Sequence, residues 1–255
     1  MSVQYIGITD FTLPSEVREM REEFIKNSLP QKRLRLMVGV MASYKTLWGL
    51  PCRWTKIFPP NDFIKQIFLQ EQPLFNCIHY ADYKNICVAD SLEKVVRIGG
   101  KNLHAIQLDM IWPDAEEIIH FKKAHPELHI ILQINTSAFN AVENDSLSLV
   151  KRLRSYGNSL NGVLLDKSQG QGIGLNEQFL RPFIKDIHLS LPNLGITIAG
   201  GLGPETLHLA EGLIQEFSFL SIDAQAQLHE NADIIQPMDW HKASLYLKKS
   251  LDLYM

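Results

Sequence analysis

Few residues in this sequence are of the kind that builds metal centres. Only 3 of the 255 residues are cysteine, and no two of them form a CxxC pair. Separated cysteines in odd number are typical of a reducing compartment and provide no zinc motif. His79 lies two positions after Cys77 and would share its strand face, but two further ligands would be needed. We therefore expect no metal site.

Long apolar runs and an excess of one charge are also missing. No segment approaches the roughly 18 apolar residues of a membrane span, and the first residues, MSVQYIGITDF, do not read as a signal peptide. The formal net charge is -3, with both signs interspersed, so no basic surface for nucleic acid or an anionic membrane is expected. These absences predict a cytoplasmic protein whose partner is a small molecule, without nucleic acid or membrane.

The glycine fingerprint of dinucleotide-binding folds is missing as well. A GxGxxG loop would follow the first strand of such a fold, whereas the chain reads GITDF at that point. We expect no cofactor.

The sequence does contain a regular alternation of short apolar runs with segments of helical periodicity. Hydrophobic residues make up 45% of the chain, which is ample for a large core. Eight runs fit buried strands, namely residues 3–9, 33–43, 74–81, 104–110, 129–137, 162–166, 194–201 and 217–224. A helix-like segment follows each of the first seven, and residues 240–251 complete the last unit.

Eight βα units in about 250 residues close naturally into a barrel. The expected fold class is therefore α/β, a (β/α)8 TIM barrel that occupies residues 1–255 as a single domain. A doubly wound open sheet is the alternative, and the missing glycine fingerprint disfavours it.

One segment, residues 44–59, interrupts the alternation and is rich in aromatic residues. It contains Tyr44, Trp48, Trp54 and Phe58. These rings would cover a planar substrate or form the contact of a homodimer, and the sequence favours neither.

Acidic residues stand where several expected strands end. Asp109, Asp166 and Asp223 end the fourth, sixth and eighth strands, and Asp10 follows the first. In a barrel, the C-terminal strand ends meet at one mouth, where active sites lie. Taken singly, each acid is explained equally well by the need of a buried strand to become polar where it leaves the core.

Two glycine loops accompany these acids. Residues 200–203 lead into Pro204, which suits the first position of a helix, so this turn would expose backbone N–H groups to a phosphate. Residues 172–174 form the second loop. Phosphate sites built from the last loops recur in this architecture.

The same segments resemble motifs of the phosphoribosylanthranilate isomerase family. GVLLDKSQGQGIG, residues 162–174, is similar to its sixth-strand motif, and ITIAGGLGPETL, residues 196–207, is similar to its seventh-strand motif. Weaker similarities lie in LSIDAQAQ, IQLD and Gly7-Ile8-Thr9. The resemblance implies that Asp166 is a general acid and that Asp223 supports the last loop. It also implies that the substrate phosphate is bound by Gly172, Gly174, Gly200 and Gly201.

Three positions depart from the family. Its general base is a cysteine immediately before Gly-Ile-Thr, and here that position is Ile6, which cannot transfer a proton. Asp10 is the candidate replacement, and otherwise it would cap the helix that begins near Pro14. The substrate carboxylate would fall to Lys45 or Arg53, and Asp109 stands where the family has a histidine.

These observations favour a divergent isomerase-like enzyme that acts on, or binds, a small phosphorylated metabolite. One alternative is a protein that binds a phosphometabolite without turnover. Another is an aldolase or lyase with a Schiff-base lysine, for which Lys45 and Lys167 are the nearest strand-end candidates.

Overall fold

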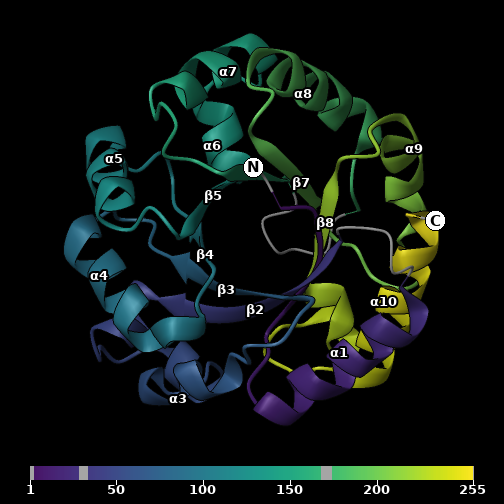
Figure 1. Cartoon of the computed structure of the whole chain (residues 1–255). Helices are drawn as coiled ribbons and strands as arrows, with labels where there is room; N and C mark the ends of the chain where they lie inside the picture. Colours follow the sequence, from purple (N-terminus) through teal and green to yellow (C-terminus); the bar gives the residue numbers. More distant parts are fainter. Residues whose placement is uncertain (1–2, 29–33, 168–173, 255) are drawn as a thin grey trace.

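Eight parallel strands close into a barrel in the order in which they occur along the chain, and helices surround it (Figure 1). The computed structural model describes residues 3–28, 34–167 and 174–254. The strands are β1 (Tyr5–Thr9), β2 (Arg35–Ser43), β3 (Leu74–Ala81), β4 (Ala105–Asp109), β5 (His129–Ile134), β6 (Gly162–Asp166), β7 (Gly195–Ala199) and β8 (Ser221–Ala224). The structure confirms the expected (β/α)8 barrel in a single domain.

The helices form the outer ring of the barrel. They are α1 (Pro14–Asn27), α2 (Tyr44–Leu47), α3 (Asn61–Ile67), α4 (Val88–Gly99), α5 (Ala115–Ala124), α6 (Thr136–Ala141), α7 (Ser146–Arg154), α8 (Glu177–Ser190), α9 (His208–Glu216) and α10 (Trp240–Leu253). Short 3-10 turns add η1 (Arg53–Lys56), η2 (Gly100–Asn102), η3 (Ala226–Leu228) and η4 (Glu230–Ala232). The last helix, α10, packs beside α1 and so closes the ring.

Two local expectations were wrong. Residues 44–59 are not a continuous irregular loop, because they contain α2 and η1. The helix after β7 begins at His208 rather than at Pro204, because residues 204–207 form turns in which the Thr206 hydroxyl donates to the Gly201 carbonyl at 2.6 Å.

The side chains of each strand alternate between two environments, as the pleat of a β-strand requires. In β1, Tyr5 packs in a small cluster inside the barrel with Met37 and Phe75. Its neighbours Ile6 and Ile8 belong instead to the large core between the strands and the helices. One face of every strand therefore lines the barrel interior and its mouth, while the other holds the helical ring in place.

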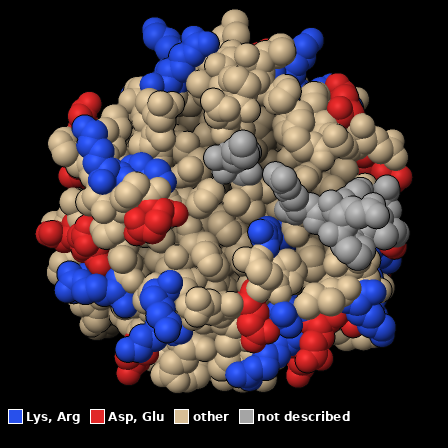
Figure 2. Space-filling view, in the orientation of Figure 1, with Lys and Arg blue, Asp and Glu red and all other residues tan. Residues whose placement is uncertain are grey.

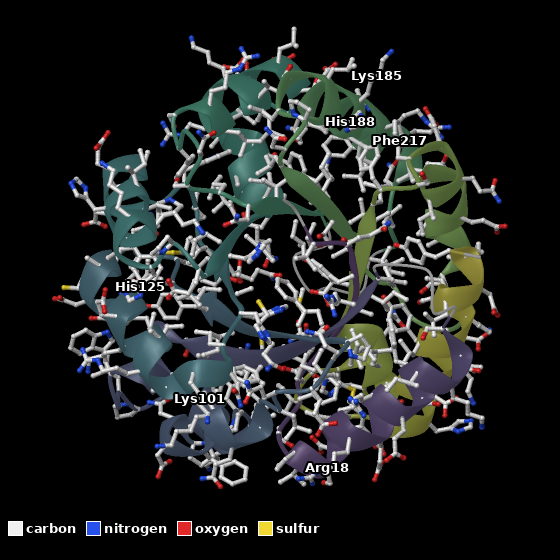
Figure 3. The ribbon with its side chains drawn as sticks, in the orientation of Figure 1. Arg18, Lys101, His125, Lys185, His188 and Phe217 are labelled. Atoms are coloured by element: carbon white, nitrogen blue, oxygen red, sulfur yellow. The ribbon has the colours of Figure 1, made fainter. Side chains whose placement is uncertain are left out.

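Charged residues lie mainly on the outer surface. Arg18, Lys101 and Lys185 extend from the periphery of the ring (Figure 3). Acidic and basic side chains are interspersed around the face drawn in Figure 2, and the described residues form no large area of one sign there. Within the described ranges, none of the helices is both long and apolar enough to cross a membrane.

Candidate active site

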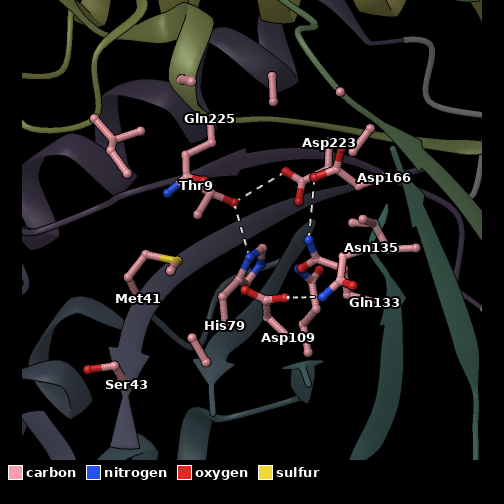
Figure 4. Close-up of a pocket in the computed structure, with 18 of the residues that line it drawn as sticks. Thr9, Met41, Ser43, His79, Asp109, Gln133, Asn135, Asp166, Asp223 and Gln225 are labelled. Carbon is pink, nitrogen blue, oxygen red and sulfur yellow. Dashed lines mark hydrogen bonds between the residues drawn. The ribbon is translucent and has the colours of Figure 1, made fainter. Parts of the chain in front are cut away.

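The C-terminal ends of the strands open into a pocket of about 640 Å³. Strand residues that line it are Thr9, Met41, Ser43, His79, Ala81, Gln107, Asp109, Gln133, Leu164, Asp166, Ala199, Asp223 and Ala224, so all eight strands contribute (Figure 4). Residues of several following loops complete the wall. Asp109, Asp166 and Asp223, the acids expected at three strand ends, thus meet in one cavity.

Asp223 lies deep in this pocket, in space left by a glycine. Its side chain is buried, and a Cβ atom at the paired position Gly7 would stand 2.4 Å from its Oδ1 atom. Burial raises the pKa of the Asp223 carboxyl to about 7, although a hydrogen bond donated by Thr9 at 3.2 Å opposes the rise. The negative charge of Asp166 adds to it. Asp223 can therefore gain or lose a proton near neutral pH, as an acid–base catalyst must.

His79 lies beside this carboxyl group and shares Thr9 with it. Its Nδ1 atom is 3.5 Å from the Thr9 hydroxyl oxygen, and its Nε2 atom is 3.3 Å from the Met37 sulfur. Burial lowers the pKa of His79 to about 3. The imidazole is thus neutral at physiological pH and adds no positive charge to the pocket floor.

Asp166 ends β6 and accepts a hydrogen bond from the nearer of two linked amides on the preceding strands β5 and β4. Gln133 donates its Nε2 hydrogen to Asp166 Oδ2 at 3.4 Å, and Gln107 donates to Gln133 Oε1 at 3.1 Å. Because a carboxylate only accepts hydrogen bonds, the Gln133 amide turns its nitrogen toward Asp166 and its oxygen toward Gln107. The side chain of Asp166 is buried but still lines the pocket, next to Asp223 in Figure 4.

Asp109 is the third acid that a strand contributes to the pocket, and both of its carboxylate oxygens accept hydrogen bonds. It accepts a hydrogen bond from the Tyr83 hydroxyl group and another from Asn135 Nδ2 at 3.2 Å. Burial raises its pKa, while these two hydrogen bonds oppose the rise. Since Asn135 also caps α6 through the Ala138 N–H group, Asp109 ties the ends of β4 and β5 together.

The rim carries the groups best suited to an anion. Gly200 and Gly201, both with positive φ angles, line the pocket after β7. Arg53 lines it from η1, with its guanidinium group 4.2 Å from the centre of the Trp54 ring. Trp54 stacks on Phe58 with ring centres 5.1 Å apart. Arg53 is the single lysine or arginine among the described lining residues.

Other residues expected at the site lie elsewhere. Asp10 does not line the pocket; its carboxylate accepts hydrogen bonds from Gln225 and His229 at 2.9 Å each. It does not cap α1 either, because the Leu13 N–H group at that helix end donates to Glu16. Lys45 is exposed on α2 outside the lining, and Lys167 places its Nζ atom 3.4 Å from the centre of the Phe179 ring.

The second glycine loop is only partly described. Gly172 lies outside the described residues, and Gly174 is exposed before α8 without lining the pocket. Gly200 and Gly201 are therefore the expected phosphate-binding glycines that the structure brings to the pocket.

Ile6 is fully buried on the helical side of β1. The inward-facing positions of this strand are Tyr5, Gly7 and Thr9. A thiol at position 6 would therefore not reach the pocket in this register.

Several residues of the pocket floor had no role predicted from the sequence. Thr9, His79, Gln107 and Gln133 stood at the expected strand ends, but only acids, glycines and loop cations were assigned functions. A usable signal existed in the pairs 107/109 and 133/135, since polar residues two apart on a strand share one face. Their hydrogen-bonded chain to Asp166 required the strand register.

Comparison with known proteins identifies the fold of this chain but no family. No protein-family model matches the sequence, and no curated protein matches it significantly. Among solved structures, the catalytic domain of a hyperthermophilic chitinase from Pyrococcus furiosus is similar, with a TM-score of 0.59 and 10% identity over 100% of this chain and 96% of that one. The YdjI aldolase from Escherichia coli K12 has a TM-score of 0.51 and 13% identity, over 99% and 91%. A Rubisco-like protein from Rhodopseudomonas palustris has a TM-score of 0.56 and 9% identity, over 99% and 65%. These likenesses identify a TIM barrel.

Proposed function

We propose that this barrel is an enzyme that moves a proton within a small phosphorylated metabolite, in the manner of an intramolecular isomerase. The observation that carries the proposal is the pair of carboxyl groups from β6 and β8, Asp166 and Asp223, which open into one pocket. An isomerisation of this type needs an acid and a base that reach the same substrate. Two carboxyl groups whose surroundings separate their proton affinities can provide both.

We assign the acid to Asp223 and the base to Asp166. Burial, with the charge of Asp166, holds the pKa of Asp223 at about 7, so that a proton is available on Asp223 at neutral pH. The resemblance to phosphoribosylanthranilate isomerases gives the acid role to Asp166 instead. In either assignment, the base need not come from position 6 or from Asp10.

The phosphate would bind at the rim, at Gly200, Gly201 and Arg53. The two glycines can present backbone N–H groups to an anion, and Arg53 supplies a positive charge. The three acids below them would repel a phosphate placed on the floor, so the reacting carbons would lie deep and the phosphate at the mouth.

A Schiff-base aldolase receives less support from the pocket, because no lysine of the described residues lines it. Lys45 and Lys167 would both have to move into the pocket to react with a carbonyl group.

The test measures the binding of a phosphate group and the conversion of sugar phosphates separately. Inorganic phosphate should raise the melting temperature, and sulfate soaked into crystals should bind at Gly200 and Gly201. A panel of sugar phosphates is then screened for isomerisation by NMR in deuterium oxide. Asp166→Asn and Asp223→Asn should each lower the rate about 100- to 10,000-fold.

Phosphoribosylanthranilate belongs in that panel, and we expect no turnover of it at the level of an authentic isomerase. Such turnover would show that the parent reaction is retained. Binding of a sugar phosphate without conversion of any compound would favour a binding protein, whereas density for sulfate only outside the pocket would contradict the phosphate site.

A further inference from the structure

The pair formed by Asp10 and His229 lies beside the candidate active site, and the proposed reaction does not use it. Nε2 of His229 is 2.9 Å from Asp10 Oδ2, and the two side chains are 5% and 11% exposed. The pair joins the end of β1 to the segment between η3 and η4, which are far apart in the sequence. A buried ion pair is costly unless its remaining hydrogen-bonding groups are satisfied, so its partners show what it does.

Both ring nitrogens of His229 face acceptors. Nε2 meets the Asp10 carboxylate, and Nδ1 is 2.7 Å from the Gln236 carbonyl oxygen. A neutral imidazole carries a hydrogen on one nitrogen only, whereas the imidazolium ion donates from both. The geometry therefore suits a positively charged His229, which donates from both ring nitrogens at once.

Asp10 also orients a residue of the pocket. Gln225 lines the pocket and donates its Nε2 hydrogen to the same oxygen, Asp10 Oδ2, at 2.9 Å. Since a carboxylate only accepts, the amide of Gln225 has one orientation, and its Oε1 atom is left for other donors. A substrate hydroxyl or ammonium group is such a donor.

The pair also holds the wall that follows β8. The Gln236 carbonyl, which His229 binds, lies just after Asp233, Ile234 and Ile235, which line the pocket. The segment is fastened further where the Asp239 N–H group donates to the Leu228 carbonyl at 2.8 Å. Loss of the charge on His229 would weaken the attachment of this wall through the Gln236 carbonyl.

We propose that Asp10 and His229 are positioning residues, which fix Gln225 as a hydrogen-bond acceptor for a substrate hydroxyl or ammonium group and hold the wall of residues 233–235 at the mouth. The pair acts through Gln225 and this wall rather than on the reacting atoms. The substrate contact rests on the proposed function of the pocket, but the state of the pair can be measured without substrate.

The charged groups around His229 agree with this assignment. Burial lowers its pKa, but the hydrogen bonds to Asp10 and Gln236 and the charges of Asp10 and Asp233 outweigh burial, so the pKa is raised from its ordinary value of 6.5. From α10, the ammonium group of Lys242 donates to the backbone carbonyl of His229 at 3.3 Å. That contact places a positive charge near the segment.

The experiment follows the ring nitrogens of 15N-labelled histidine by NMR as pH rises, with His229→Gln used to assign the signals. In the unaltered protein, both nitrogens of His229 should carry hydrogens at pH 6, and its pKa should lie above 6.5. In Asp10→Asn, burial is no longer outweighed, so the pKa should fall. A His229 with one protonated nitrogen at pH 6, or a pKa unmoved by Asp10→Asn, would overturn the proposal.

Hydrogen exchange at a single pH tests the attachment of the wall. In Asp10→Asn, the amides of His229 and Asp239 should exchange roughly ten- to a hundredfold faster, since charge-assisted hydrogen bonds are lost. Asp62→Asn, which alters an exposed acid on α3, serves as the control. Unchanged exchange in Asp10→Asn would contradict the positioning role, whereas an inactive protein with an intact pair would contradict only the proposed function.

Discussion

Gly7 of β1 and Asp223 of β8 are paired across neighbouring strands, and the carboxyl group of Asp223 occupies the space that a side chain at position 7 would fill. A Cβ atom there would lie 2.4 Å from Oδ1 and 2.8 Å from Cγ of Asp223. The burial of this acid, and therefore its raised pKa, depends on the absence of a side chain on the adjacent strand.

We expect Gly7→Ala to displace Asp223 and to destabilise the barrel by about 1 to 3 kcal/mol, the usual cost of overpacking. Urea unfolding measures this loss. The matched control is Gly212→Ala on α9, where the added methyl group meets only the flexible end of Glu177 and where alanine favours the helix. Equal stability of the two variants would contradict the tight fit of Gly7 against Asp223.

Asp223→Asn should stabilise the protein at high pH. The pKa of Asp223 is about 7 in the folded protein and 3.8 ordinarily. The contribution of this carboxyl group to the free energy of unfolding is therefore fully present below pH 3.8 and is lost as pH rises through 7. The asparagine variant lacks this decline, so its free energy of unfolding at pH 9 should exceed that of the parent by about 1 to 4 kcal/mol, with little difference at pH 4. Thermal and urea unfolding at both pH values measure the difference. If the parent gained stability relative to the variant between pH 5 and 8, the raised pKa of Asp223 would be refuted.

Arg53→Ala should weaken the binding of inorganic phosphate about tenfold, because it removes the lining cation, and added salt should reduce the difference. Lys45→Ala is the matched control, since Lys45 is exposed outside the lining. Isothermal titration of both variants measures the effect. A larger loss of phosphate affinity in Lys45→Ala than in Arg53→Ala would show that the anion binds at Lys45 and would contradict the proposed site.

Ile6→Cys should yield a thiol that reacts slowly with an aromatic disulfide reagent, because position 6 is fully buried on the helical side of β1. Ala199→Cys should react much faster, since Ala199 lines the pocket. Both substitutions are placed in a protein whose Cys52 and Cys87, which are not fully buried, have been changed to serine. Fast reaction at position 6 would show that β1 has a different register.

The barrel could be predicted from the sequence because each strand is a short apolar run that ends in polar residues. Those runs also located Asp166 and Asp223 correctly at the strand ends. The protonation states of these acids could not be predicted from the runs. The direction in which Ile6 points could not be derived, since it depends on the register between β1 and its neighbours. The match to the family motif therefore gave the position of Ile6 along β1, but not the face of the strand on which its side chain lies.

Loop residues were harder to predict than strand residues. The partnership of Asp10 with His229 joins positions 219 residues apart, and no local pattern connects them. The start of α9 was misjudged because Pro204 fits a helix N-terminus equally well as a turn, and the Thr206 hydroxyl stabilises the turn. Gln107 and Gln133 were visible as polar residues, but the hydrogen bonds from Gln107 to Gln133 and from Gln133 to Asp166 arise only from the pairing of adjacent strands.

The two faces of each strand separate the residues that line the pocket from those that hold the helices in place. Substitutions at inward positions such as Thr9 and Asp223 can alter the pocket without repacking any helix, and exchanges among Ile6, Ile8 and their outer neighbours can adjust the packing without touching the pocket. Deleting one residue from β1 would exchange the two sets, bringing isoleucines into the pocket and a threonine against the helices. Evolution of such a chain therefore tolerates point substitutions on either face far more readily than a change in strand length.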